Sequence, residues 1–288
     1  MTTIAPRRRR PIDRENSYGP IRVLVGVLIA LIFSVPIYLV VVNVLKPSSA
    51  IFSNPAALPA PPTLENFISV LSRSDGLFWN GLINSTQITV LSVFATIILA
   101  SNCAYYLARN TGRVTQVIVV LIVVGMMIPG ASIIQPIIQI LLSAGLIGTI
   151  PGLIIVNVAG AMPFAILVFM GFVRSIPIEL EQAAAVDGAG PFRIFWQIVF
   201  PLMRPAVATV LIFTAVGVWN DFIMPLIVLG PGSGTTVTVG LYRSVSQYTS
   251  DYGAVFAFMV LATIPILLLF LFFQRYFVKG LIAGATKG

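Results

Sequence analysis

Several polar and aromatic side chains stand inside long apolar stretches of the sequence, and six of them could bind a polar solute. They are Gln135, Gln139, Asn157, Trp219, Asn220 and Asp221. Amides and a carboxylate can hydrogen-bond the hydroxyl groups of a sugar, and a flat indole ring can pack on its C–H surface. Because polar groups are costly in lipid, such side chains usually line a protein interior or a water-filled path. These residues are therefore candidates for contacts with a polar solute.

The six candidates differ in how specific they are. Gln135 and Gln139 are four residues apart and share one face of a helix, but amides also simply bond one helix to another, so both interpretations stay open. Asp221 is less ambiguous, since a charge within an apolar segment indicates function by default. It could line a path or its gate, or pair with a group on a partner subunit.

Other chemistry is excluded by what the sequence lacks. There is no His and only one Cys, Cys103, which lies in an apolar segment and cannot form an intramolecular disulfide. Zinc sites and His-based catalysis are therefore excluded, and we predict no catalytic residue and no metal ligand. The sequence also has no Gly-rich phosphate-binding loop followed by Lys. An intramembrane hydrolase would need a paired base and nucleophile, which the apolar segments do not offer.

The elements that position these residues are membrane-spanning helices. The chain is 58% hydrophobic and 9% charged, with a mean hydropathy of +1.00. These values are typical of a multi-pass membrane protein, and only helices satisfy their own backbone in such long apolar segments. We predict an all-α fold of six spans, at about 21–45, 81–107, 114–142, 151–173, 206–229 and 254–277.

The placement of Lys and Arg predicts the orientation and argues against nucleic-acid binding, despite the net charge of +8. With the N-terminus inside, all basic residues except Lys46, Arg73 and Arg243 fall on the inner side. This bias predicts that both termini are cytoplasmic. Residues 1–20 would be a basic cytoplasmic tail, 21–280 the membrane domain, and 281–288 a cytoplasmic C-terminal tail.

The loop between the fourth and fifth spans, residues 179–205, has a distinctive pattern. Residues 178–186 are mostly helix formers and end at Asp187-Gly188, where Gly tolerates the left-handed backbone of a helix end. Pro191 can begin a second helix, which Pro201 and Pro205 would end or kink. Two short helices and a tight turn would form a rigid projection at the membrane surface. The alternative is an ordinary loop with amphipathic helices at the interface.

This loop resembles the EAA loop of permease subunits of binding-protein-dependent ABC importers. The resemblance implies that the loop contacts a cytoplasmic ATPase and passes its motion to the membrane helices. The residues that match the motif, or stand at its positions, are Glu179, Glu181, Gln182, Ala183, Ala184, Asp187, Gly188 and Ala189. Gln182 departs from the family, which usually has an acid there, and Glu181 is a candidate to take over that role.

Three further stretches are similar to carbohydrate-importer permeases, and the last of them resembles the terminus of the maltose-type permease subunit. They are Pro62–Phe67 (PTLENF), Trp219–Asp221 (WND) and the C-terminal sequence from Gln274 to Gly288. The resemblance implies the type I ABC importer permease fold in a prokaryotic cell membrane. It implies one half of a translocation pathway for a sugar, such as a di- or oligosaccharide. Its partners would be a second permease subunit, two ATPase subunits that bind ATP and Mg²⁺, and an extracytoplasmic solute-binding protein.

Two other functions remain as alternatives. One is a permease of an ABC importer for a non-sugar solute. The C-terminal sequence and the WND sequence argue against this alternative. The other is an ion-coupled secondary transporter, which usually has internal repeats and buried acids at the membrane midplane. Asp221 is the one clear acid within a predicted span, and no matching second half is evident.

Overall fold

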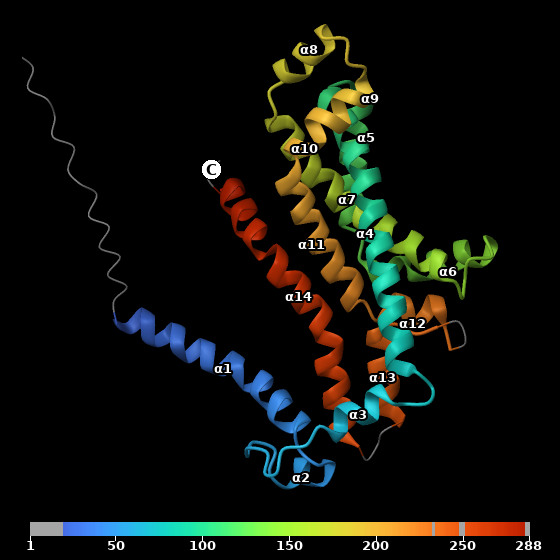
Figure 1. The fold of residues 1–288 in the computed structure, drawn as a ribbon. Helices are drawn as coiled ribbons and strands as arrows, with labels where there is room; N and C mark the ends of the chain where they lie inside the picture. The colour runs from blue at the N-terminus through green and yellow to red at the C-terminus, as the bar shows by residue number, and fades with distance from the viewer. Residues whose placement is uncertain (1–19, 232–233, 248–250, 286–288) are drawn as a thin grey trace, which may run out of the picture.

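A computed structural model describes residues 20–231, 234–247 and 251–285, and in this part of the chain all regular secondary structure is helical (Figure 1). The elements are α1 (Pro20–Val44), α2 (Ser48–Ser53), α3 (Glu65–Leu71), α4 (Leu77–Arg109), α5 (Arg113–Met126), α6 (Gly130–Ser143), α7 (Ile150–Ser175), α8 (Glu179–Val186), α9 (Pro191–Ile194), the π-helical turn η1 (Phe195–Val199), α10 (Phe200–Leu202), α11 (Arg204–Asn220), α12 (Ile223–Leu229), α13 (Val237–Gln247) and α14 (Tyr252–Ala285). The predicted all-α class is confirmed for the described residues. The predicted tails, 1–20 and 281–288, lie largely outside them.

Four long helices, α4, α7, α11 and α14, run along the molecule and form its core (Figure 1). The α4–α7 pair makes the most extensive helix contact. Its interface joins the small residues Ala100 and Ala104 of α4 to Phe169 and Val173 of α7, and all four are fully buried. Small side chains let two helix backbones approach closely, which favours packing where lipid supplies no hydrophobic drive.

Two of the six predicted spans are not single straight helices. Among the described residues four helices are long and apolar enough to cross a membrane: Val23–Val44, Leu77–Arg109, Ile150–Ser175 and Tyr252–Phe273. The predicted span 114–142 is instead α5 followed by α6, with a bend of 106° between them. The bend falls at Pro129-Gly130, where Pro cannot continue the hydrogen-bonding pattern of α5.

The predicted span 206–229 is also divided. Its helix α11 ends at Asn220, and the chain is non-helical at Asp221 and Phe222 before α12 begins. A second bend, of 75°, separates Pro191–Leu202 from α11, close to Pro201 and Pro205. Apolar composition thus continues through these breaks, while the backbone changes direction.

The end of the molecule opposite α8 is fixed by buried polar side chains. Asn66 of α3 donates to the carbonyls of Val44 and Lys46, and Nζ of Lys46 donates to the carbonyls of Asn54 and Pro55. Each bond satisfies a backbone group left over at a helix end or turn. These contacts hold α1, α2 and α3 together beneath the long helices.

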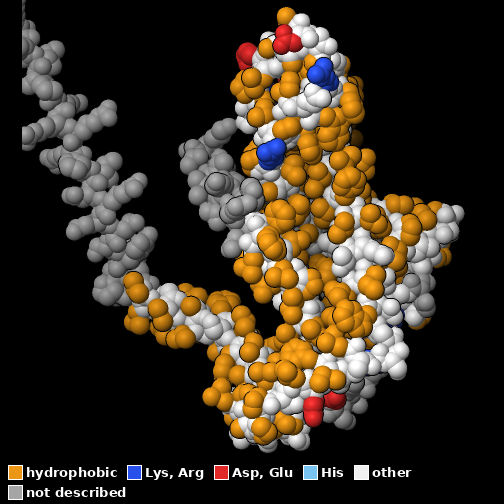
Figure 2. Space-filling model, in the orientation of Figure 1, with side chains coloured by type: hydrophobic (Ala, Val, Ile, Leu, Met, Phe, Trp, Pro, Cys, Tyr) orange, Lys and Arg blue, Asp and Glu red, His pale blue; other side chains and the backbone are white. Residues whose placement is uncertain are grey.

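The surface separates charge from apolar area. In Figure 2 hydrophobic side chains cover the middle of the molecule, and the visible charged side chains lie around α8–α10 and at the opposite end. The C-terminal end of helix α1 lies against the bundle, and the rest of the helix extends away from it (Figure 1). Residues 23–38 of α1 are exposed. An exposed apolar belt of this kind is typical of a protein in contact with lipid or with other membrane helices.

Candidate coupling loop and translocation cavity

Residues 179–205 form a compact projection, which we call the coupling loop. The helix predicted over 178–186 is confirmed as α8, and the N–H groups of Gly188 and Ala189 close its end on the carbonyls of Ala185 and Ala184. Gly188 has φ +82°, a conformation that favours Gly over residues with a side chain. Pro191 begins α9, as the sequence predicts. The turn therefore sets the angle between α8 and the chain that leads into α11.

The predicted coupling residues divide into an outer and an inner set. Glu179, Gln182, Ala183, Asp187 and Gly188 are exposed, whereas Ala184 and Ala189 are partly buried against the core. The outer set lies beside two large exposed apolar side chains, Val186 (88% exposed) and Phe192 (78% exposed). An apolar surface that carries acids is suited to a protein partner with basic groups.

Glu181 belongs to the inner set, and its burial bears on the role considered for it from the sequence. It is 7% exposed, and both of its carboxylate oxygens already accept hydrogen bonds from α4. The donors are the hydroxyl of Tyr105, at 2.7 Å, and Nε and an Nη of Arg109, at 2.8 and 2.5 Å. Glu181 is therefore held against α4 and is not on the exposed face of α8, and its taking the place of the missing acid at Gln182 stays a prediction.

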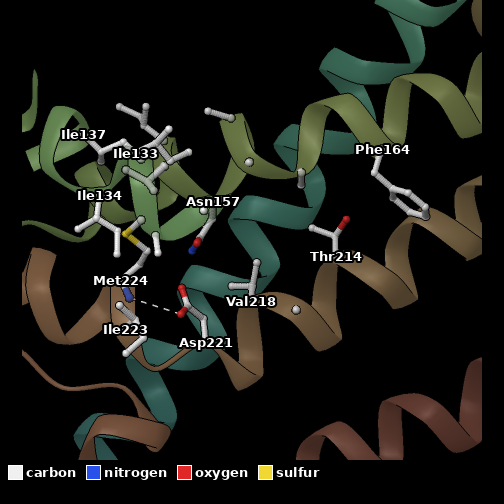
Figure 3. Close-up of a pocket in the computed structure, with 18 of the residues that line it drawn as sticks. Ile133, Ile134, Ile137, Asn157, Phe164, Thr214, Val218, Asp221, Ile223 and Met224 are labelled. Atoms are coloured by element: carbon white, nitrogen blue, oxygen red, sulfur yellow. Dashed lines mark hydrogen bonds between the residues drawn. The ribbon is translucent and has the colours of Figure 1, made fainter. Parts of the chain in front are cut away.

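A cavity of about 1050 Å³ lies between α6, α7, α11 and α12. Its lining is mostly aliphatic, with Ile133, Ile134 and Ile137 contributed by α6 (Figure 3). Two aromatic rings, Phe164 of α7 and Phe213 of α11, border it with their centroids 5.3 Å apart. Two of the helix breaks, at Pro129-Gly130 and after Asn220, lie at this cavity, since Gly130 and Asp221 line it. Irregular backbone at membrane depth is tolerated where it lines a cavity, and the two breaks fit that rule.

Three of the predicted path residues line this cavity: Asn157 of α7 and the adjacent Asn220 and Asp221 at the end of α11. The side chains of Asn157 and Asp221 point toward one another (Figure 3). The carboxylate of Asp221 accepts from the N–H of Met224 at 3.4 Å, and its backbone carbonyl accepts from the hydroxyl of Thr238 at 2.6 Å. The break after Asn220 thus presents a carboxylate to a space whose lining is mostly aliphatic.

The other three predicted path residues lie elsewhere. Gln135 and Gln139 share a face of α6, but that face is exposed and is not the one that lines the cavity. Trp219 is 6% exposed and its indole N–H donates to the carbonyl of Ala262 at 3.2 Å. Its described contacts therefore join α11 to α14.

Comparison with known proteins identifies the family. Residues 93–283 match the family model described as binding-protein-dependent transport system inner membrane component. The melibiose/raffinose/stachyose import permease protein MelC of Bacillus subtilis is 33% identical over 266 residues, which cover 92% of this chain and 95% of MelC. The chain belongs to this family of inner-membrane transport components.

Other relatives of the permease agree with this assignment. The multiple sugar-binding transport system permease protein MsmG of Streptococcus mutans is 34% identical, with 88% of this chain and 91% of MsmG covered. The diacetylchitobiose uptake system permease protein NgcG of Streptomyces coelicolor is 34% identical, with 97% and 92% covered. The resemblance inferred from the coupling loop and from the three shorter stretches is thereby confirmed, and so is the membrane location.

The fold of the permease is also that of solved transporters. It matches a chain of a bacterial ABC transporter involved in import of the acidic polysaccharide alginate, with a TM-score of 0.77, 23% identity, and 90% of this chain and 99% of that chain covered. A second match is the alginate transporter in complex with a periplasmic protein that holds an alginate pentasaccharide, with a TM-score of 0.65 and 14% identity. The predicted ABC importer permease fold is confirmed at this level.

Sequence reasoning missed the partners that hold the site in place. From the sequence, Arg109 indicates only the orientation of the chain in the membrane, yet in the structure it forms an ion pair with Glu181. Asn84 and Ser85 of α4 bind the backbone of Thr235 and Val237, and so fix the start of α13 next to the cavity wall. Each pair is separated by at least 72 residues, and no local pattern predicts such contacts.

Proposed function

We propose that the permease forms one half of the translocation pathway of an ATP-driven importer for a di- or oligosaccharide. One observation carries this proposal: within the coupling loop, the exposed α8 is followed by α9, η1 and α10, which lead directly into α11, and the far end of α11 carries Asn220 and Asp221 into the cavity. A displacement of the loop can therefore reach the solute path through a short series of helical segments.

The arrangement of the helices supports a six-span topology in which the bent pairs α5–α6 and Pro191–Leu202 with α11 each count as one span, the second of which begins in the coupling loop and crosses as α11. The coupling loop, the end of α4 and the C-terminal part of α14 lie toward one end of the molecule, and α2, α3 and α13 lie toward the other (Figure 1). The end with the coupling loop is the one that the basic residues place in the cytoplasm, together with both termini. In this orientation an ATPase can reach α8.

The sugar as solute is supported by the relatives, whose names describe melibiose, raffinose, stachyose and diacetylchitobiose import. In the cavity, Asp221, Asn157 and Asn220 supply acceptors and donors for hydroxyl groups, and Phe164 and Phe213 supply ring faces. The remaining lining is aliphatic, so we propose that a second permease subunit provides further polar contacts. Two ATPase subunits would bind ATP and Mg²⁺, and a solute-binding protein would deliver the sugar.

Uptake into proteoliposomes tests the proposal. The permease is reconstituted with its second permease, ATPase and binding protein, and uptake of radiolabelled melibiose and raffinose is measured. We expect uptake that needs internal ATP and the binding protein, and that persists when ionophores collapse ion gradients. Uptake that runs on an ion gradient without ATP would indicate a secondary transporter instead. ATP-driven uptake of amino acids or phosphate, but not sugars, would indicate a non-sugar importer.

A further inference from the structure

The inward-facing Glu181 has a different environment from its neighbours on α8. Glu179 and Gln182 are exposed, whereas the carboxylate of Glu181 lies against the last two turns of α4. Its Oε2 accepts from the hydroxyl of Tyr105, and its Oε1 accepts from two nitrogens of Arg109. We call these three residues, Tyr105, Arg109 and Glu181, the Glu181 cluster. Among the described residues, the side-chain donors to the Glu181 carboxylate are therefore Tyr105 and Arg109, both on α4.

Arg109 joins a third helix to the cluster. The Nη atom that bonds Glu181 also donates to the carbonyl of Ile176 at 3.0 Å, and Ile176 is the first residue beyond α7. A guanidinium is planar and has several donors in fixed directions, so it can bind a carboxylate and a carbonyl at once. One side chain thus connects the cytoplasmic ends of α4 and α7 with the start of α8.

The cluster also contacts the segment that leads to the cavity. The ring of Tyr105 packs on Phe195 with centroids 5.1 Å apart, and Phe195 is the first residue of the π-helical turn η1. Such turns are uncommon inside helices and often mark functional positions. The hydroxyl of Tyr105 binds α8 while its ring contacts η1, so the position of α8 is set relative to the chain entering α11.

We propose that Glu181 is a positioning residue that fixes α8 to α4 and α7, so that a displacement of the coupling loop moves these helices with it. This inference rests on the proposed function, because it assumes that an ATPase displaces the loop. Separating the pair would leave a buried charge without its partner, which is strongly unfavourable. The ion pair therefore keeps α8 and the ends of α4 and α7 together when force is applied. The partner-facing surface is then left to Glu179, Gln182, Val186 and Asp187.

The proposal separates two properties of the importer: binding of the ATPase and the number of solute molecules moved per ATP. In the reconstituted importer, Glu181→Gln keeps the shape of the side chain but removes its charge. We expect the ATPase to co-purify as with wild type, and uptake per ATP hydrolysed to fall at least tenfold. The matched variant Glu179→Gln, on the exposed face of the same helix, should show the opposite result: weaker ATPase binding and an unchanged ratio.

A milder variant keeps the test decisive if Glu181→Gln does not fold. Tyr105→Phe removes one hydrogen bond to the cluster and keeps the ring on Phe195, and we expect uptake per ATP to fall two- to fivefold. A wild-type ratio in both Glu181→Gln and Tyr105→Phe would overturn the proposal. So would loss of the ATPase from a folded Glu181→Gln permease, because Glu181 would then be a docking contact. If the wild-type complex itself showed no ATP-driven uptake, the proposed function would fail and this inference would fail with it, whereas a transporting wild-type complex whose ratio both variants keep would refute this inference alone.

Discussion

The turn between α8 and α9 gives a prediction whose size follows from backbone geometry alone. Gly188 and Gly190 stand two residues apart, and an added Cβ would meet no atom within 4 Å at either position. They differ in conformation: Gly188 has φ +82°, and Gly190 has φ −72° and ψ 164°, which any residue adopts. Substitution by Ala therefore isolates the cost of the left-handed backbone from any steric effect.

We expect Gly188→Ala to cost about 1–2 kcal/mol, the penalty for placing an L-residue in the left-handed region. If the turn relaxes to avoid this cost, the fraction of permease with a docking-competent loop falls by up to about 5–30-fold. The apparent Kd for the ATPase rises by the same factor, because only the competent fraction binds. Gly190→Ala should leave the Kd within about twofold of wild type.

The assay is a titration of labelled ATPase against purified permease in detergent, followed by fluorescence anisotropy. Gly188→Asn provides a further comparison, because Asn tolerates the left-handed region better than Ala and should restore part of the affinity. An unchanged Kd in Gly188→Ala, or an equal loss in Gly190→Ala, would show that the conformation of this turn does not control docking.

Three further predictions concern other parts of the permease. In Gly253→Ala the new Cβ would overlap the buried side-chain amide of Asn66 and break its two hydrogen bonds to backbone carbonyls. We therefore expect the free energy of unfolding to fall by about 2–4 kcal/mol. The control Gly125→Ala should cause no loss, because a Cβ at Gly125 meets no atom within 4 Å. Asp221→Asn should reduce sugar uptake roughly tenfold or more while the complex still assembles, because hydrogen bonds to charged groups contribute about 1.5–3 kcal/mol; unchanged uptake would remove Asp221 from the solute path. Val186→Asp should weaken ATPase binding at least about tenfold without lowering the thermal midpoint of the isolated permease, because Val186 is 88% exposed before docking.

Local sequence signals anticipated local structure well. The coupling loop has the predicted helix, the Gly turn and the second helix that begins at Pro191, because each depends on the backbone preferences of a few adjacent residues. Hydropathy was less informative for 114–142, since residues on both sides of Pro129-Gly130 are apolar and composition does not record the direction of the backbone.

Tertiary relations could not be predicted in the same way. Helical periodicity places Gln135 and Gln139 on one face of α6, but it does not say that this face turns away from the cavity. The acids of α8 appear equivalent in sequence, and only packing against α4 separates buried Glu181 from exposed Glu179. The ion pair of Glu181 with Arg109 joins two residues 72 positions apart, with no local pattern to indicate it.

The central claim is that an exposed cytoplasmic loop of the permease is covered by an ATPase that drives transport. A single cysteine at Val186, placed in a Cys103→Ser background, tests it with a membrane-impermeant maleimide. We predict labelling in inside-out vesicles stripped of the ATPase, protection when the ATPase is added back, and no labelling of intact cells. Labelling of Val186→Cys from outside intact cells, or equal labelling with and without bound ATPase, would contradict the account.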